Sequence, residues 1–244
     1  MSRYSYNKNF FEIIDTPSRA YWFGFLCADG SITRFYKGEN LRSMSVELTV
    51  KSDDEGHLHK YLEALESNTP IQHREIHLQS TGKTYTACRC VINNTHLCWD
   101  LIDHGCTPCK STTLMFPDSK DVPPELLSHF MRGYFDGDGS ISQYMWGRQK
   151  TTVWTLCGTE EFLTQFGAVL TENGVQLASG PKAEKRGEKI YELRIYGLAN
   201  IQCLMAFLYQ DSTPSIRLDR KYNTYQSMDF VDRRSLTKAG QRTS

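Results

Sequence analysis

Residues 20–32 read AYWFGFLCADGSI and residues 129–141 read HFMRGYFDGDGSI, so the chain carries one short motif twice. Gly-Ser-Ile ends both copies, and the residues before it match at a constant offset. The aligned pairs are Gly24 with Gly133, Phe25 with Tyr134, Ala28 with Gly137, and Asp29 with Asp138. A repeat of this kind indicates a duplicated structural unit, and it guides the interpretation of everything between the copies.

The likeness between the two halves continues beyond the motifs. Residues 44–65 resemble residues 151–170, and residues 90–111 resemble residues 194–221, in the same order. This order predicts an α+β fold made of two copies of one αββαββα-like unit. The predicted boundaries are a first half-domain over 1–114, a Pro-containing linker over 115–124, a second half-domain over 125–230 and a flexible basic tail over 231–244.

Strands are predicted from alternating apolar and polar residues. In residues 43–51, Met44, Val46, Leu48 and Val50 share one face, and the residues between them are polar. Further strands are predicted near 71–79, 84–92, 176–184 and 188–196. Each sheet should therefore have one dry face and one wet face, and a solvated surface is the ordinary explanation of the wet one.

Each motif has the marks of a helix with two defined ends. Pro17 and Pro124 suit a first turn, where a missing N–H costs nothing. Gly30 and Gly139 suit the left-handed position that follows a last turn. We therefore predict one helix ahead of each Asp-Gly pair.

Small residues lie four apart in both predicted helices and so share one helical face. They are Gly24 and Ala28 in the first copy, and Gly133 and Gly137 in the second. Glycine inside a helix costs ~1 kcal/mol relative to alanine, and close backbone packing is what can offset that cost. We expect the two motif helices to pack against each other through this face, about a pseudo-twofold axis.

This packing would bring Asp29 and Asp138 together at the C-terminal ends of both helices, beside unpaired carbonyls and the negative ends of the helix dipoles. Carboxylate and carbonyl oxygens are the ligands of hard cations, so we expect Mg²⁺, with Mn²⁺ or Ca²⁺ as other divalent occupants. A single Asp-Gly pair is ordinarily a turn. Its recurrence inside a repeated context favours a shared metal site.

Composition narrows the function only slightly. Lysine plus arginine number 28, as do aspartate plus glutamate, so the net charge is zero. A DNA-binding protein of this kind would have to segregate its basic residues onto one face. The sequence has no membrane-spanning apolar run and no secretory signal, and its eight cysteines are expected to be reduced, so a soluble intracellular protein is predicted.

The segments FGFLCADG and RGYFDGDG resemble the two motifs of single-chain LAGLIDADG homing endonucleases, and the resemblance extends from about residue 15 to about residue 228. It implies two pseudo-symmetric αββαββα half-domains, packed through the motif helices, that form a saddle of antiparallel sheets in the major groove of a long double-stranded DNA site. It also implies a monomeric, site-specific endonuclease that acts in intron homing. Asp29 and Asp138 would be the metal-binding catalytic acids, and Ala28 and Gly137 would offer backbone oxygens. Lys110 and Lys221 would be the basic catalytic residues, and Cys27 departs from the family pattern where Asp136 keeps it.

Direct DNA contacts are expected from polar side chains of the strands and their turns, although the target sequence cannot be inferred. The candidates are Arg34, Arg42, Gln72, Arg74, His77, Gln79, Arg89, Gln143, Arg148, Lys182 and Arg194.

Other functions compete with the nuclease. A non-cleaving relative could act as an RNA maturase on intron RNA or as a DNA-binding regulator, but retention of both motif acids favours cutting. An intein is disfavoured because the terminal residues of protein splicing are missing. A zinc module built from Cys88, Cys90, Cys106 and Cys109 has tolerable spacing but is less favoured, and the histidines show no spacing typical of metal ligands.

Overall fold

The fold is described from a computed structural model, which covers residues 4–78, 82–147, 149–184 and 189–228. Two successive αββαββα units account for the elements, and one further helix follows. The first unit comprises α1 (Pro17–Asp29), β1 (Gly30–Lys37), β2 (Asn40–Lys51), α2 (Glu55–Ala64), β3 (Gln72–Leu78), β4 (Lys83–Asn93) and α3 (Thr95–Asp103). The second comprises α4 (Leu127–Asp138), β5 (Gly139–Trp146), β6 (Gln149–Gly158), α5 (Glu160–Glu172), β7 (Lys182–Ala183), β8 (Tyr191–Tyr196) and α6 (Leu198–Tyr209), followed by α7 (Asp219–Gln226).

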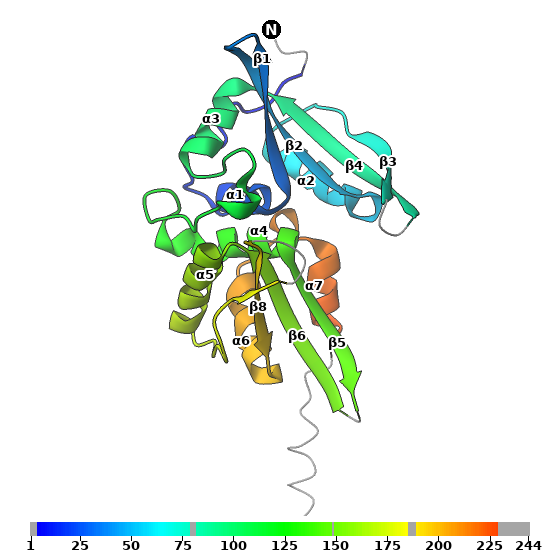
Figure 1. Cartoon of the computed structure of the whole chain (residues 1–244), viewed down its shortest axis with the longest axis vertical. Coiled ribbons are helices and arrows are strands. Elements are labelled where there is room, and N and C mark those ends of the chain that lie inside the picture. Colours follow the sequence, from blue (N-terminus) through cyan, green and yellow to red (C-terminus); the bar gives the residue numbers. More distant parts are fainter. Residues whose placement is uncertain (1–3, 79–81, 148, 185–188, 229–244) are drawn as a thin grey trace, which may run out of the picture.

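Each unit forms its own four-stranded antiparallel sheet, and the two sheets have equivalent strand orders. The first is ordered β1-β2-β4-β3 and the second β5-β6-β8-β7. The N-terminal unit lies above the C-terminal unit in Figure 1, and α1 and α4 lie between them. The predicted α+β fold of two equivalent half-domains is confirmed.

The interface between the half-domains is a direct backbone contact between α1 and α4. A Cβ atom added to Gly24 would overlap the carbonyl oxygen of Phe130, and one added to Gly133 would overlap the carbonyl oxygen of Tyr21. One turn further on, a Cβ at Gly137 would overlap the side chain of Ala28. The small residues are therefore required because any larger side chain would separate the helices.

The helix ends form differently from the prediction in two respects. Pro124 begins a short 3-10 turn (Pro124–Leu126) directly ahead of α4 and is not in the first turn of α4 itself. Thr16 caps α1 by accepting a hydrogen bond from the Arg19 backbone N–H, with Pro17 in the first turn as predicted. Gly30 and Gly139 are not left-handed, because their φ angles are −73° and −97°. Glycine is needed there for space, since a Cβ would overlap the preceding helical turn in both halves.

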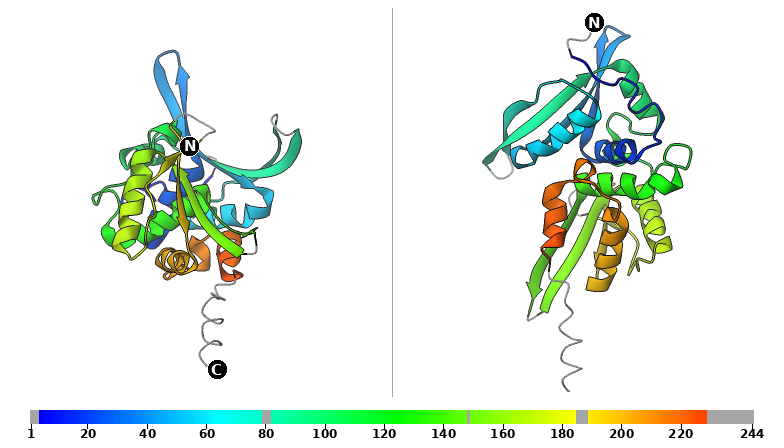
Figure 2. Two further views of the ribbon diagram at one scale, coloured as in Figure 1. Left: turned by 60° about the horizontal axis from the view of Figure 1, so that its bottom comes forward. Right: turned by 180° about the vertical axis from the view of Figure 1, so that it is seen from behind.

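The dry sheet faces carry the cores of the two units. Val46 and Leu48 of β2 are buried, as are Trp154 and Leu156 at equivalent places in β6. Helices α2 and α5 cover these faces with residues such as Leu58, Leu62, Phe162 and Phe166. The opposite faces remain open. In the right view of Figure 2, β1–β2 and β5–β6 extend to opposite sides of the helical interface.

Ion pairs between distant segments join the half-domains next to the motif helices. Arg220 of α7 binds both carboxylate oxygens of Asp54 at 2.9–3.1 Å. Lys60 of α2 binds Asp219 at 2.7 Å and also donates to the Arg217 carbonyl. Helix α7, which lies outside the repeat, thus fastens the second unit to the first.

Some predicted segments differ from the structure or lie outside it. The strand predicted over 176–184 is reduced to the two residues Lys182–Ala183. Residues 231–244, Gln79 and Arg148 lie outside the described residues. None of the helices in the described ranges is both long and apolar enough to cross a membrane.

The backbone contact makes a stability prediction. Gly133→Ala should lower the free energy of unfolding by on the order of 1–3 kcal/mol, because the added methyl group must displace the Tyr21 carbonyl. Gly56→Ala is the matched control in α2, where an added Cβ meets nothing within 4 Å, and it should stabilise by up to ~1 kcal/mol. Urea unfolding measures both changes; equal stability of Gly133→Ala and the parent would contradict the packing.

Candidate active site and nucleic-acid interface

Asp29 and Asp138 are the last residues of α1 and α4, so the contact between these helices sets the positions of both carboxyl groups. An atom at the Cβ position of Gly137 would lie 3.4 Å from Oδ2 of Asp29, which places one acid against the end of the other helix. Both aspartates are exposed to solvent. Asp29 and Gly137 line one hollow of about 250 Å³ where the half-domains meet.

The two acids resist ionisation in this setting. Surrounding protein atoms displace part of the water around the Asp138 carboxyl group. This desolvation and the negative charge of Asp29 raise the pKa of Asp138 to about 6. Loss of surrounding water also raises the pKa of Asp29, against the opposing charges of Lys221 and Lys110. A carboxyl group whose ionisation is opposed by a neighbouring carboxylate is suited to sharing a cation with it.

Lys110 and Lys221 occupy equivalent places at the ends of the motif helices. Lys110 is buried, and its Nζ donates to the carbonyl oxygen of Gly30 directly after α1. Lys221, also buried, donates to the carbonyl oxygens of Phe135 at 2.7 Å and Gly137 at 3.2 Å. Burial lowers the pKa of Lys221 to about 8. Cations at helix C-termini offset the negative dipole ends and the two acids together.

The residues two positions before the acids differ between the halves. Asp136 is fully buried and accepts hydrogen bonds from Tyr21 Oη at 2.8 Å, Tyr209 Oη at 2.5 Å and the Leu218 backbone N–H at 2.8 Å. Its equivalent, Cys27, is buried beside Cys106, and burial raises the pKa of the Cys27 thiol. Asp136 therefore has a structural role, because Tyr21 belongs to α1 and the bond crosses between half-domains.

A buried arginine completes the polar network beneath α4. Arg132 donates to the carbonyl oxygens of Ile216 at 2.8 Å and Leu208 at 2.7 Å, and its guanidinium lies 5.4 Å from the Tyr21 ring centroid. It also contacts Nδ1 of His129 at 2.8 Å. Because these carbonyl oxygens satisfy its guanidinium group, Arg132 orients the segment that leads to Lys221. It does not contact Asp29 or Asp138.

Residues that the sequence did not single out also line the hollow beside Asp29. Lys51 lies at the end of β2, while Asp54 and Arg220 come from opposite half-domains. Lys51 is the polar residue that ends an alternating strand, so the pattern contains a signal for it. The Asp54–Arg220 pair has no local signal because its members are 166 residues apart.

The donor set at the helix ends fits a hard divalent cation. Asp29 and Asp138 supply carboxylate oxygens, and Gly137 and Ala28 supply carbonyls in last helical turns, which have no intrahelical partner. The Gly137 carbonyl accepts one bond from Lys221 and keeps a second lone pair. Oxygen-only donors match Mg²⁺, Mn²⁺ or Ca²⁺ better than softer ions.

The strand register divides the predicted DNA contacts between two faces. Thr49 pairs with Arg89, which pairs with Gln72, and Arg74 follows two residues later on the same open face. In the second sheet, Arg194 pairs with Thr155 and Lys182 with Glu192, also on the open face. Exposed aromatic residues that the sequence did not single out join these faces, namely Phe35, Tyr144 and Tyr196.

Other predicted contacts point away from the open faces. Arg34 follows buried Ile32 by two residues and lies 5.6 Å from the Trp99 ring of α3. Gln143 donates to Thr152 on the side of buried Ile141. The His77 ring nitrogen lies 3.1 Å from the Thr84 hydroxyl, on the helix side of β3. Arg42 is unpaired at the irregularity between β1 and β2.

Basic and acidic residues are mixed on the open faces and are not segregated there. Glu47 binds Arg89 at 3.1 Å and Arg74 at 3.4 Å. In the second sheet, Arg194 binds Glu192 at 2.6 Å. The expected separation of charge is therefore not seen on these strands, and acidic partners hold the arginines in place.

The four cysteines of the alternative zinc module, Cys88, Cys90, Cys106 and Cys109, do not come together as a group of possible ligands among the described residues. Cys106 is buried against Cys27, and its Sγ donates to the Leu26 carbonyl oxygen. Cys109 is exposed, whereas Cys88 contacts Glu55 in another part of the unit. Among the described residues, the three donors close enough to share an ion are Glu55, His73 and Cys88.

Solved structures with the same fold, a pair of αββαββα units joined by motif helices, resemble this chain. No protein-family model and no curated protein sequence matches the chain. The structure of the LAGLIDADG homing endonuclease I-GzeII with its DNA target matches at a TM-score of 0.58 and 11% identity, over 94% of this chain and 93% of that chain.

Two further structures extend the comparison. I-SmaMI bound to cleaved DNA matches at a TM-score of 0.58 and 12% identity, with 87% of each chain covered. The meganuclease I-AabMI bound to uncleaved DNA matches at 0.52 and 12% identity, over 93% of this chain and 92% of that one. The chain therefore has the LAGLIDADG homing endonuclease fold.

The raised pKa of Asp138 predicts how stability depends on pH without metal. The folded pKa of about 6 exceeds the unfolded value of ~3.9, so the folded chain binds more protons between them and loses stability as pH rises through that window. Asp138→Asn should raise Tm at pH 7.5 in EDTA, and by less at pH 4.

Thermal unfolding by circular dichroism measures this difference. Glu63→Gln, at an exposed position of α2, removes one negative charge and serves as the control. Adding Mg²⁺ at pH 7.5 should stabilise the parent more than Asp138→Asn. A variant that is less stable than the parent in EDTA at pH 7.5 would contradict the electrostatics of the pair.

Proposed function

We propose that this protein is a site-specific DNA endonuclease that cuts both strands of a long duplex target, one strand per half-domain. The observation that carries the proposal is the convergence of Asp29 and Asp138 at the ends of two tightly packed helices, between two open sheet faces. The DNA-bound state of structures with the same fold supports it. A single chain holds both half-domains, so a monomer suffices for the reaction.

Phosphodiester hydrolysis requires charge neutralisation at the scissile phosphates. Asp29, Asp138 and the carbonyls of Ala28 and Gly137 would hold Mg²⁺ or a similar divalent cation. When bound, the cation activates water, orients the phosphates and stabilises the leaving oxygens. A structure of I-SmaMI bound to its uncleaved DNA target was obtained in the presence of calcium ions, which supports the use of a divalent cation.

The chain's own residues would prepare this site in three ways. The backbone contact at Gly24 and Gly133 fixes the spacing of the acids. Lys110 and Lys221 supply positive charge beside both acids and are placed to stabilise charge that develops on phosphate. Lys51, at the edge of the same hollow, adds a cation on the path of the DNA backbone.

The open sheet faces would contact the major groove. Gln72, Arg74 and Arg89 lie together on one face, and Lys182 and Arg194 lie on the other. Arginine and glutamine form paired hydrogen bonds with purine edges, so these side chains can read sequence. Glu47 orients Arg74 and Arg89 before DNA binds, which reduces the entropy lost on contact.

Cleavage is tested in two stages because the target is unknown. A randomised duplex library is first selected for binding in Ca²⁺, and the enriched sequence is then incubated with Mg²⁺. The parent should make double-strand breaks, while Asp29→Asn and Asp138→Asn should each slow them by about 100-fold or more and leave a nick at most. Both variants should still bind the target in Ca²⁺, and Glu63→Gln serves as the cutting control.

Two results would contradict the nuclease. One is that both single variants cut as fast as the parent. The other is a chain that selects no duplex but still promotes splicing of an intron RNA after both substitutions, which would identify an RNA-binding function on the same fold.

The assignment of sheet faces predicts a difference between two arginines. Arg89→Ala should weaken binding to the selected duplex by about 5- to 100-fold, the value of a paired base contact. Arg34→Ala should have a several-fold smaller effect, since its guanidinium packs on Trp99 on the other side. Fluorescence anisotropy at two salt concentrations measures both; a larger loss for Arg34→Ala would overturn the interface.

A further inference from the structure

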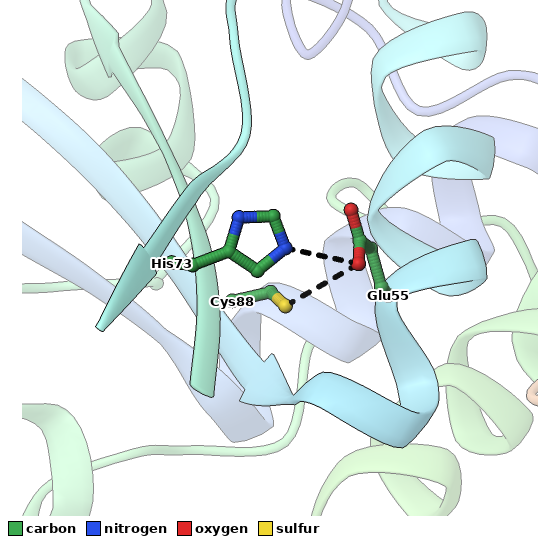
Figure 3. A group of neighbouring side chains, drawn as sticks. All are labelled: Glu55, His73 and Cys88. Atoms are coloured by element: carbon green, nitrogen blue, oxygen red, sulfur yellow. Dashed lines mark hydrogen bonds and ion pairs between the residues drawn. The ribbon is translucent and has the colours of Figure 1, made fainter. Parts of the chain in front are cut away.

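Three side chains that are far apart in the sequence converge on the helix side of the N-terminal sheet. Glu55 is the first residue of α2, His73 lies in β3 and Cys88 lies directly opposite His73 in β4. Figure 3 shows the imidazole ring and the thiol both directed at the Glu55 carboxylate. None of the three residues in this group, the Glu55–His73–Cys88 cluster, lines the hollow beside Asp29, and none has a part in the proposed cutting reaction.

The distances within the cluster suit one small cation. His73 Nε2 lies 3.0 Å from Glu55 Oε2, and Cys88 Sγ lies 3.7 Å from the same oxygen. All three donor atoms lie within 4.8 Å of one another. A tetrahedral zinc ion with its usual bond lengths holds such donors about 3.3–3.7 Å apart, so side-chain adjustments of about 1 Å would form the site.

The cluster also provides access and a fourth ligand. Cys88 is fully buried, whereas the His73 side chain is 53% exposed, so an ion can enter from the solvent side. His59 follows Glu55 by one helical turn, and its Nε2 lies 3.8 Å from Glu55 Oε1. His59 or a water molecule can therefore complete four-coordination.

The donor chemistry selects a different metal from the one expected at the motif acids. One thiolate, one imidazole and one carboxylate form a mixed set that favours zinc, whereas the oxygen-only set at the helix ends favours magnesium. The positive end of the α2 dipole opposes a cation near Glu55, but two anionic ligands outweigh that partial charge.

We propose that the Glu55–His73–Cys88 cluster is a structural zinc site that fastens the β3–β4 hairpin to α2. The hairpin is the outer part of the N-terminal sheet, and its other face carries Arg74 and Arg89. An ion bound to all three residues restrains the hairpin on one side while the arginines face outward on the other. The site would thus position part of the proposed DNA-contacting surface without touching DNA.

Proton release should accompany zinc binding. Cysteine binds zinc as the thiolate, so the Cys88 thiol gives up its proton when the metal binds. Because the thiol must lose its proton, the affinity for zinc rises with pH.

The test uses the full chain carrying Asp29→Asn and Asp138→Asn, so that the catalytic acids do not contribute. Metal-free protein is titrated with Co²⁺ chloride, and a thiolate-to-cobalt charge-transfer band should appear with a stoichiometry of one ion per chain. Cys88→Ser, which exchanges one atom, should abolish the band, and His73→Ala should weaken Co²⁺ binding at least tenfold. The matched controls Cys203→Ser and His96→Ala should keep the band.

Thermal unfolding with zinc sulfate gives an independent readout. Zinc should raise Tm of the same double variant, and Cys88→Ser should remove that rise. No band in the parent, a band that survives Cys88→Ser, or equal weakening by His73→Ala and His96→Ala would overturn the site. Since no DNA is present and the catalytic acids are absent, these results are independent of whether the protein cuts.

Discussion

The contact on which this structure depends is the one between the backbones of α1 and α4. The two helices touch where Gly24 faces the Phe130 carbonyl and Gly133 faces the Tyr21 carbonyl, and no side chain fits between them. The distance between the half-domains is therefore set by main-chain atoms, which cannot relax as side chains do. This distance also sets the positions of the residues at the ends of the two helices. They are the two acids and the glycines that begin β1 and β5.

Such close approach concentrates negative charge, and the chain balances it with buried cations from elsewhere. Two helix C-termini and two carboxylates meet here, and desolvation by burial together with the charge of Asp29 raises the pKa of Asp138. Lys110 and Lys221 arrive from segments after α3 and α6 and bind carbonyls at the two helix ends. Arg220, next to Lys221, binds Asp54 of the other half-domain, so the same short helix both neutralises the centre and locks the units together.

Much of this arrangement was predictable because the motif occurs twice, so a feature expected in one half could be compared with the same positions of the other half. The four-residue spacing of small residues gave the helical interface, and alternation gave the dry face of β2. Alternation also places Arg34 on the same face as buried Ile32, and Gln143 on the same face as buried Ile141. A shift of one residue moves a strand side chain to the opposite face, so a list of polar strand residues mixes both faces.

The remaining differences have physical causes outside local sequence. Glycine is needed at position 30 because a Cβ would overlap the preceding helical turn. A glycine needed for space and a glycine needed for a left-handed cap cannot be told apart in the sequence. The Asp54–Arg220 pair and the Glu55–His73–Cys88 cluster depend on tertiary packing between distant segments.

The most direct test of the central claim is a crystal structure of the protein with its selected DNA duplex and Mn²⁺, with anomalous scattering used to locate the metal. If the two acids share a metal site, manganese density should lie between Asp29 and Asp138, within bonding distance of both carboxylates. Density at only one of these acids, or carboxylates directed at different surfaces, would contradict it.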